Sequence, residues 1–508
     1  MLEGLALISG DIVLYLFLGV AISTFVVIIP GLGGSFALAI LLPFIFRLDA
    51  TAGIAFMMAI TAVNGTGNTI TSILFGIPGS ASGVASTFDG FPMTQRGEGI
   101  RAVSAGLTAS LIGGLLGAFA LALSLPVIRP IVLAFRPPEF FALILLALVF
   151  MSYVSGADKF KALISGGLGV MLSFVGMEGS TATQRWTFGN LAFWEGFSLI
   201  PVLLGLYAVT EMVGLMRRGG AIAKRPPQEG PFRQLLQGAK DTLSHKMAVL
   251  QSSVSGMWVG LAPGMGDAAA QFIGYGQVAR TSKRGHLFGT GEVEGVIAAD
   301  AATNSKEGGA LIPTLAFGIP GSSGMAIILA GFLAFGIQPG PTMITDNIDI
   351  VWMIIWILVF ANIIAAVLCA FITPGMAKVT GLRASLIVGP ILVASMLGAF
   401  SVRNNFIDVY VLLGFGLLGT LLKEFGYSRP LLLIGFVLGP LLEHNYLLSM
   451  RIWGTGFLTR PIVMILGAVM LLVVLSPLIG NLVRGLRRPK SGDDSGDRAE
   501  ATVAADGE

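Results

Sequence analysis

Long apolar stretches recur along almost the whole chain and are separated by short polar or glycine-rich segments. Two of them, 351–374 and 461–480, hold no charged residue and reach the roughly 20 residues that a helix needs to cross a bilayer. The others lie near 12–30, 51–63, 104–126, 138–155, 160–176, 195–216, 246–262, 385–400, 405–422 and 429–443. The pattern predicts an all-α polytopic membrane protein with roughly 10–13 transmembrane helices plus re-entrant or broken-helix hairpins.

Composition agrees with this fold class. Of the 508 residues, 54% are hydrophobic, a further 69 are glycine, and only 12% are charged. A water-soluble globule cannot hide that much apolar surface, so an ordinary soluble enzyme is excluded. The formal net charge is only +3, which gives no sign of nucleic-acid binding.

Basic residues between the apolar stretches indicate topology. Lysine and arginine gather at 217–245 and again just after residue 483. Cytoplasmic loops carry such an excess, so both segments are predicted to be cytoplasmic. The chain then divides into an N-terminal membrane repeat (1–216), a basic linker (217–245), a C-terminal membrane repeat (246–484) and a disordered tail (485–508).

An internal repeat is the most informative feature of the sequence. Residues 75–80, Phe-Gly-Ile-Pro-Gly-Ser, recur unchanged at 317–322, an offset of 242 residues (317 − 75). Upstream of each copy, Pro-Gly-Leu-Gly at 30–33 matches Pro-Gly-Met-Gly at 263–266. Two ordered pairs of matches at similar spacing indicate a duplication.

Proline and glycine together break a helix, because proline lacks a donor and glycine tolerates unusual dihedral angles. In a membrane the freed backbone groups must be satisfied by protein or by water in a cavity. Matching breaks in two repeats are typical of transporter substrate sites, where half-helix N-termini face anionic groups. The predicted structural breaks are Pro30, Gly31, Gly33, Pro263, Gly264 and Gly266. The predicted substrate-binding residues are Pro78, Gly79, Ser80, Ser82, Pro320, Gly321, Ser322 and Ser323. The alternative is a tight loop or close helix packing.

The loops that flank the repeats alternate in charge. The segment 94–101 is basic, whereas its counterpart at 336–349 has two aspartates and no lysine or arginine. The loop after the first Pro-Gly-x-Gly has few charges, whereas the loop after the second is basic. This alternation predicts two inverted-topology repeats.

Polar residues precede each copy of the hexapeptide, and uncharged oxygens beside flexible backbone suit a monovalent cation. The predicted cation-binding residues are Asn64, Gly65, Thr66, Gly67, Asn68, Thr303, Asn304 and Ser305. Asp267 and Asp300 are predicted to contribute to coupling, since acids inside membranes are rarely without function. The alternative is a polar surface loop, which the adjacent Lys306 and Glu307 favour for the second cluster.

Several other residues and motifs have ordinary structural explanations. Glu211 is expected to form an interfacial ion pair with Arg217 or Arg218, and Asp89 to be a turn residue. Residues 79–83 resemble a serine-hydrolase elbow, but alanine takes the central position and no histidine base is near in sequence. No Gly-Lys dipeptide exists, so a Walker A phosphate loop is absent. The single cysteine and the three histidines suggest neither a metal site nor a cofactor. The one ion expected is a sodium ion, which would act as the coupling ion at the polar clusters.

The whole chain to about residue 485 resembles the large membrane subunit of the tripartite tricarboxylate transporter family. The segments that carry the resemblance are 30–34, 64–93 and above all 288–341, with Gly289-Thr290-Gly291 and Gln338-Pro339-Gly340-Pro341.

The resemblance implies a secondary transporter in a bacterial inner membrane that imports a di- or tricarboxylate by sodium or proton symport. It also implies two partners, a small membrane subunit and a periplasmic solute-binding protein. Rival classes are an ion channel or carrier without a binding protein, an intramembrane serine hydrolase, and a structural membrane scaffold.

Overall fold

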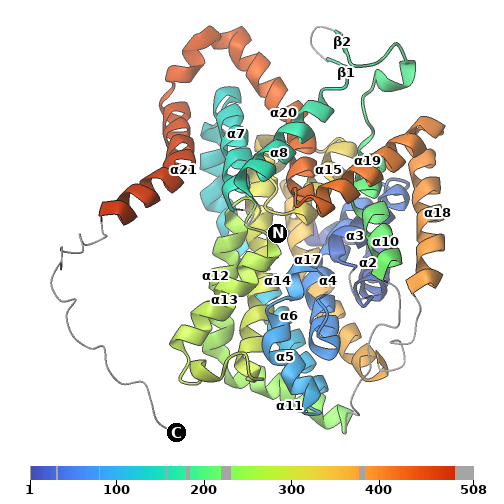
Figure 1. The fold of residues 1–508 in the computed structure, drawn as a ribbon, viewed down its shortest axis with the longest axis vertical. Coiled ribbons are helices and arrows are strands. Elements are labelled where there is room, and N and C mark those ends of the chain that lie inside the picture. Colours follow the sequence, from blue (N-terminus) through green and yellow to red (C-terminus); the bar gives the residue numbers. More distant parts are fainter. Residues whose placement is uncertain are drawn as a thin grey trace, which may run out of the picture.

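The computed structural model describes residues 2–29, 32–78, 80–154, 158–178, 183–218, 230–376 and 384–486. The predictions for Pro30, Gly31 and Gly79 lie outside these residues, as do those for 219–229 of the linker and almost all of the tail. The chain is an all-α polytopic membrane protein. Its described strands are β1 (Gly176–Met177) and β2 (Gln184–Arg185), which pair antiparallel at the top of Figure 1.

The helices of the N-terminal half follow one another in short connections. They are α1 (Leu2–Ala6), α2 (Gly10–Val27), α3 (Gly34–Ile45), α4 (Ala50–Phe75), η1 (Ala81–Gly83), α5 (Ser86–Gln95), α6 (Gly99–Ala134), α7 (Pro137–Val154), α8 (Lys159–Ser173), η2 (Leu191–Phe193), α9 (Leu199–Leu203), the π-helix η3 (Leu204–Val209) and α10 (Thr210–Arg218).

The C-terminal half contains the remaining helices. They are α11 (Pro231–Ser244), α12 (Lys246–Leu261), α13 (Gly266–Thr281), η4 (Gly285–Leu287), α14 (Val293–Phe317), α15 (Ser323–Ala334), α16 (Pro341–Thr345), α17 (Ile348–Ile372), α18 (Ala384–Arg403), α19 (Phe406–Glu424), α20 (Arg429–Trp453), η6 (Gly454–Thr459) and α21 (Pro461–Leu486).

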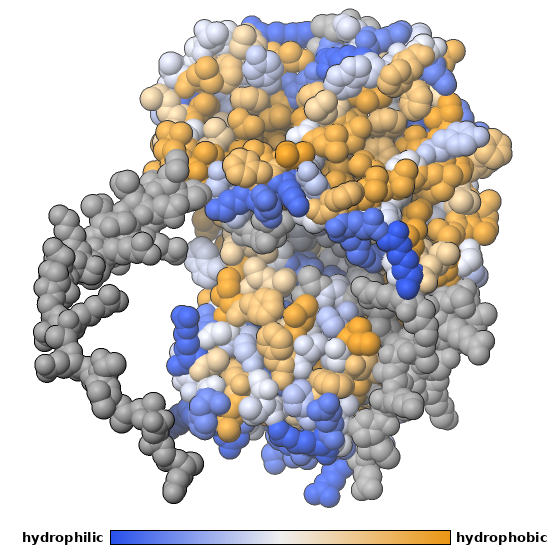
Figure 2. All heavy atoms as spheres, viewed as in Figure 1, coloured by the Kyte–Doolittle hydropathy of each residue, from blue (hydrophilic) through white to orange (hydrophobic). Residues whose placement is uncertain are grey.

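Six helices in the described residues, α2, α4, α6, α17, α19 and α20, are long and apolar enough to cross a membrane. Six further apolar helices are shorter, with 10–17 residues. Several stretches that were expected to span therefore form short helices, because breaks and loops interrupt them. Apolar side chains cover a broad area of the upper part of the molecule, with polar residues at its upper rim and lower end (Figure 2).

Two helices cross at the centre of the molecule, and their contacts give their relative directions. Thr66 of α4 lies beside Asn304 of α14, and Thr69 lies beside Asp300. Because the numbering rises along α4 as it falls along α14, the two helices run antiparallel. Figure 1 shows both in the middle of the bundle.

Helix α6 runs parallel to α14 and touches it closely. A Cβ on Gly113 would lie 2.3 Å from the carbonyl oxygen of Ala301, and one on Gly308 would lie 2.2 Å from the backbone of Gly117. Gly113 and Gly117 form the small-residue face on which such close packing depends.

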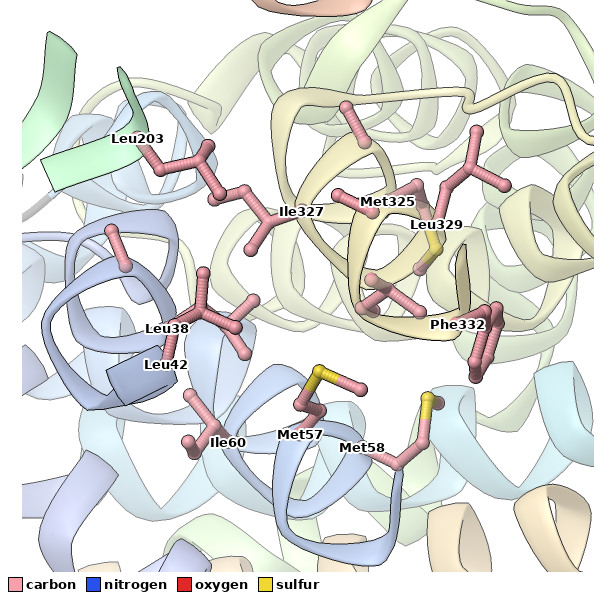
Figure 3. Packing of buried hydrophobic residues seen from close by; sticks show 14 of the residues in the cluster. Leu38, Leu42, Met57, Met58, Ile60, Leu203, Met325, Ile327, Leu329 and Phe332 are labelled. Carbon is pink, nitrogen blue, oxygen red and sulfur yellow. The ribbon is translucent and has the colours of Figure 1, made fainter. Parts of the chain in front are cut away.

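The two halves share an apolar core. Met57, Met58 and Ile60 of α4 face Leu38 and Leu42 of α3 and the side chains of α15 (Figure 3). Because α15 belongs to the C-terminal half, this packing joins the halves. In a lipid environment such contacts stabilise the fold through close van der Waals packing.

Candidate functional site

The two copies of the hexapeptide end their helices in the same way. Helix α4 ends at Phe75 and α14 at Phe317, and the glycine that follows each has a left-handed conformation, with φ of +65° at Gly76 and +68° at Gly318. Each glycine N–H donates to a carbonyl four residues back at 3.1 Å. This is the αL termination that glycine favours. We call residues 76–83 the first corner and residues 318–322 the second corner.

The first corner turns back along α4 toward the centre of the molecule. Asn68 donates from Nδ2 to Ser80 Oγ and to Ser82 Oγ, both at 2.7 Å. Ser82 is buried, whereas Ser80 and Pro78 are half-buried. The hydroxyl of Ser82 thus contacts the amide of Asn68 and the hydroxyl of Ser80, and neither of these two groups is a general base.

The second corner leads into α15. Ser322 caps this helix by accepting a hydrogen bond from the backbone N–H of Met325 at 3.3 Å. The hydroxyl of Ser323 lies 3.1 Å from that of Ser35 in the first turn of α3. The carbonyl of Gly321 accepts a hydrogen bond from the N–H of Gly264 at 3.0 Å.

Each Pro-Gly-x-Gly motif lies where one helix stops and another starts. Gly33 is the N-cap of α3, and the N–H of Gly34 donates to Asn64 Oδ1 at 2.8 Å. In the other half, Gly264 and Gly266 have φ of +78° and +72°, and α13 begins at Gly266, just beyond Pro263. We call residues 32–34 the first tip and residues 262–266 the second tip.

Both tips and both corners therefore meet around the crossing of α4 and α14. Ser323, directly after the second corner, contacts Ser35, directly after the first tip, and Gly321 of the second corner accepts a hydrogen bond from Gly264 of the second tip. The first corner contacts α13, since the N–H of Ala85, just beyond this corner, donates to Gln271 Oε1 at 2.9 Å. The sequence repeat thus corresponds to four helix interruptions that gather in one region.

The polar clusters before the corners lie inside continuous helices. Residues 64–68 belong to α4 and residues 303–305 to α14, and all of them are buried. The surface-loop alternative is therefore wrong for both, including Lys306 and Glu307. The expectation of a glycine-loosened backbone at Gly65 and Gly67 is also wrong, because both are helical, so the available ligand oxygens are those of side chains.

Several buried oxygens at this crossing lack a hydrogen-bond partner among the described residues. Asn304 donates from Nδ2 to Thr66 Oγ1 at 2.8 Å and to Asn362 Oδ1 at 3.0 Å, which leaves its own Oδ1 without a donor. The other oxygens of this kind near the clusters are Asn68 Oδ1, Ser72 Oγ and Asp300 Oδ2. Thr303 and Ser305 instead donate to carbonyls of their own helix.

Asp300 is fully enclosed between the two halves. Its Oδ1 accepts from the hydroxyl of Ser86 at 2.8 Å, and Ser86 in turn accepts from Gln271 Nε2 at 3.1 Å. Its Oδ2 has no well-formed hydrogen bond, although Thr69 lies beside it. A buried carboxylate with one free oxygen requires a proton or a cation nearby.

Asp267 occupies a different position at the second tip. Its carboxylate accepts from the ammonium of Lys306, which also donates to Glu307 Oε1 at 3.0 Å. The two predicted coupling acids therefore lie in separate surroundings, since Asp300 is hydrogen-bonded to the hydroxyl of Ser86 and Asp267 is ion-paired with Lys306.

Two functional predictions outside the clusters need correction. Glu211 forms an ion pair as expected, but its partners are Arg429 at 2.8 Å and Lys423 at 2.9 Å, because α19 and α20 bring these side chains to it. Asp89 lies inside α5 and is buried.

Asp89 holds the start of α14, a role that sequence reasoning missed. Its Oδ1 accepts from the N–H groups of Gly289 and Gly291 at 2.8 Å and of Glu292 at 2.9 Å, and its Oδ2 accepts from Tyr275 at 2.8 Å. The signal was the Gly-Thr-Gly segment at 289–291, which supplies two of these donors.

Two of the hollows in the structure lie away from the crossing. One of about 520 Å³ is lined by α20 and by the segments around β1, including Arg185, Glu443 and Arg451. Another of about 490 Å³ lies between the ends of α3, α15 and α18 and includes Arg47. Neither contains the predicted binding residues.

Comparisons with known proteins cover most of the chain. Residues 13–434 match the model of the tripartite tricarboxylate transporter TctA family. An uncharacterized 52.8 kDa protein in the TAR-I ttuC' 3' region of Agrobacterium vitis is 30% identical over 473 residues, 92% of this chain and 94% of that protein. An uncharacterized protein in the TAR-II ttuC' 3' region of the same organism is 34% identical over 230 residues, 44% of this chain and 95% of that protein. No solved structure matches the chain.

Proposed function

The chain belongs to the tripartite tricarboxylate transporter TctA family, and we propose that it imports an organic di- or tricarboxylate by cation symport. Membership makes it a transporter component and a multi-pass membrane protein. The observation that carries the proposal is the meeting of two tips and two corners around the crossing of α4 and α14. Alternating access would take place around this meeting point.

The substrate carboxylates bind at the second corner and the two tips. Helices α3, α13 and α15 begin there, and the first N–H groups of a helix have no partner within it. Ser323 and Ser35 supply hydroxyl groups beside two of these N-termini. Ser80 and Ser82 supply hydroxyl groups at the first corner.

The coupling cation binds between α4 and α14. Asp300 Oδ2 and Asn304 Oδ1 lie one helical turn apart on α14, are buried, and lack hydrogen-bond donors. Thr69 and Gly65 of α4 face them. Carboxylate and amide oxygens in a buried site suit a sodium ion. A proton on Asp300 would neutralise the same negative charge.

The lower end of the molecule in Figure 1 faces the cytoplasm. Helix α11 lies at this end and packs on α6, with Arg101 paired to Asp241 at 2.6 Å. The basic residues that gather there include Arg96, Arg101, Arg233, Lys240, Lys246, Arg280, Lys283 and Arg284. The excess follows the positive-inside rule. The antiparallel course of α4 and α14 supports the predicted inverted repeat, because equivalent helices would cross the membrane in opposite directions.

The family works as part of three-component systems. The partners of this chain are a small membrane subunit and a periplasmic solute-binding protein that delivers the carboxylate. The bilayer is the inner membrane of a bacterium.

Uptake by proteoliposomes tests the proposal. The chain is reconstituted with its membrane subunit and binding protein, and uptake of radiolabelled citrate or succinate is measured with an inward sodium gradient, an inward proton gradient, or neither. We expect saturable uptake that one gradient drives. Flux that does not saturate would favour a channel, and uptake that persists without either gradient would contradict symport.

Asp300→Asn tests the cation site in the same assay. The amide keeps a hydrogen-bonding oxygen but removes the charge that a cation or proton would neutralise, so gradient-driven accumulation should be lost. Asp11→Asn makes the same chemical change at an exposed position in the first turn of α2 and should leave uptake unchanged. If both variants accumulate substrate like the wild type, Asp300 is not the coupling residue.

A further inference from the structure

Lys306 is a buried cation in the middle of the transport region. Its side chain is 2% exposed, and its ammonium donates to the carboxylates of Asp267 and Glu307. A buried ammonium needs such partners, because a buried charge without a partner strongly destabilises the fold. Among the residues just described at the tips and corners, Lys306 is the one that carries a positive charge.

Lys306 lies where the second tip meets the second corner. A Cβ on Gly260, at the end of α12, would lie 2.3 Å from the carbonyl oxygen of Lys306. Asp267 belongs to the first turn of α13, directly after Gly266. The hydrogen bond from Gly264 to Gly321 joins the same tip to the second corner. The ammonium is therefore beside the N-terminus of α13, which favours negative charge.

The counterpart of Lys306 in the first repeat is an uncharged residue. An offset of 242 residues places Lys306 at the position of Asn64 (306 − 64). Asn64 contacts the first turn of α3, where its amide oxygen accepts from Gly34. Lys306 contacts the first turn of α13, where its ammonium donates to Asp267. Each side chain thus reaches the start of a half-helix, but only the second site pairs a cation with a carboxylate.

We propose that Asp267 is a built-in competitor for the substrate, and that a substrate carboxylate takes its place on the Lys306 ammonium. This inference rests on the proposed function and deepens it, since it names the group that recognises the anion. In the exchange, the ion pair between Lys306 and Asp267 breaks and a pair between Lys306 and the substrate carboxylate forms. The Asp267 side chain is 18% exposed, so it can turn toward water, whereas Lys306 and Glu307 are enclosed.

Removing the competitor should tighten binding. With Asp267→Asn the ammonium loses an anionic partner, and the population of protein ready to accept a carboxylate rises. The dissociation constant for citrate or succinate should fall by about fivefold or more. Lys306→Gln removes the recognising charge and should weaken binding by roughly 30-fold or more.

The experiment measures equilibrium binding of radiolabelled citrate and of succinate to the full chain in lipid nanodiscs. Asp241→Asn is the matched control, because Asp241 is also ion-paired and its side chain is 19% exposed, but it lies on α11 beside Arg101. Its dissociation constant should stay within about twofold of the wild type. Thermal unfolding of each variant shows whether the fold is retained.

The outcomes separate the inference from the proposed function. If the wild type binds an anion and Asp267→Asn binds it equally or more weakly, Asp267 has a structural role and the inference is overturned. If the wild type binds neither anion, the proposed function fails and the inference fails with it. If Lys306→Gln does not fold, the Asp267→Asn result decides alone. The inference predicts that this variant binds the anion more tightly than the wild type, whereas a structural role for Asp267 predicts equal or weaker binding.

Discussion

Asn304 of α14 donates a hydrogen bond to Thr66 of α4 across 2.8 Å, although 238 residues separate them in the sequence. The bond joins the two polar clusters that precede the two copies of the hexapeptide. Asn304 also reaches Asn362 of α17 at 3.0 Å. One side chain therefore links the halves at the point where the proposed cation site lies.

Thr66→Val should loosen this link. The substitution keeps the shape of the side chain and removes the acceptor for Asn304, so stability should fall by about 0.6–1.7 kcal/mol, as for other interhelical bonds in membranes. Thermal unfolding of the purified protein measures the loss. Thr61→Val is the control, since Thr61 is buried in the same helix but bonds only its own backbone at Met57. Equal unfolding temperatures for the two variants would contradict the prediction.

Gly65→Ala should separate α4 from α14. A Cβ at this position would lie 2.0 Å from Asn304 Oδ1, and forcing an extra methyl into a packed interior costs roughly 1–3 kcal/mol. Uptake should be lost together with part of the stability. Gly414→Ala in α19 places a methyl where nothing lies within 4 Å and should be tolerated. Normal uptake by Gly65→Ala would show that the helices can move apart without consequence.

Gly76→Ala should be more harmful than Gly318→Ala. Both glycines have positive φ, and a left-handed conformation costs an alanine about 1–2 kcal/mol. At Gly76 the methyl would also lie 2.9 Å from the ring of Phe91, whereas at Gly318 the nearest atom is 3.7 Å away. Unfolding temperatures of the two variants should differ in that order. The reverse order would show that the second corner is the more tightly constrained.

Asp89→Ala should destabilise the protein far more than Tyr275→Phe. Alanine leaves three backbone N–H groups at the start of α14 without their acceptor, and hydrogen bonds to a charged group contribute about 1.5–3 kcal/mol each. Phenylalanine removes only the bond from Tyr275 to Oδ2. The amount of folded protein in membranes and its unfolding temperature measure both effects. Similar values for the two variants would argue against this anchoring role.

The N-terminus of α4 offers a test of pH dependence at a position outside the membrane-spanning segments. Asp49 caps this helix, and hydrogen bonds from Thr51 and Ala52 hold the pKa of its carboxyl below the ordinary value. A lowered pKa in the folded state stabilises the protein above the ordinary pKa, and this contribution is lost as the pH falls through the lowered value. Asp49→Asn should therefore show a shallower loss of stability between about pH 5 and pH 3 than the wild type. Parallel unfolding curves over that range would contradict the assignment.

The sequence by itself determined the class of fold and the positions of the interruptions. Apolar stretches longer than a core helix needs predict a membrane protein, because no soluble fold can bury them. The repeated Pro-Gly motifs predict helix breaks, because the preferences of these two residues act locally. Gly264, Gly266 and the two corners are interruptions of this kind.

Only the tertiary structure decided which groups meet. The sequence favoured a surface loop for Lys306, because Lys306 and Glu307 are charged. It favoured a turn for Asp89, because a glycine and a proline follow within three residues. Lys306 finds Asp267 from another helix, and Asp89 finds N–H donors about 200 residues away. A buried charge is stable only beside its partner, and a pairing between distant segments leaves no local pattern from which it could be predicted.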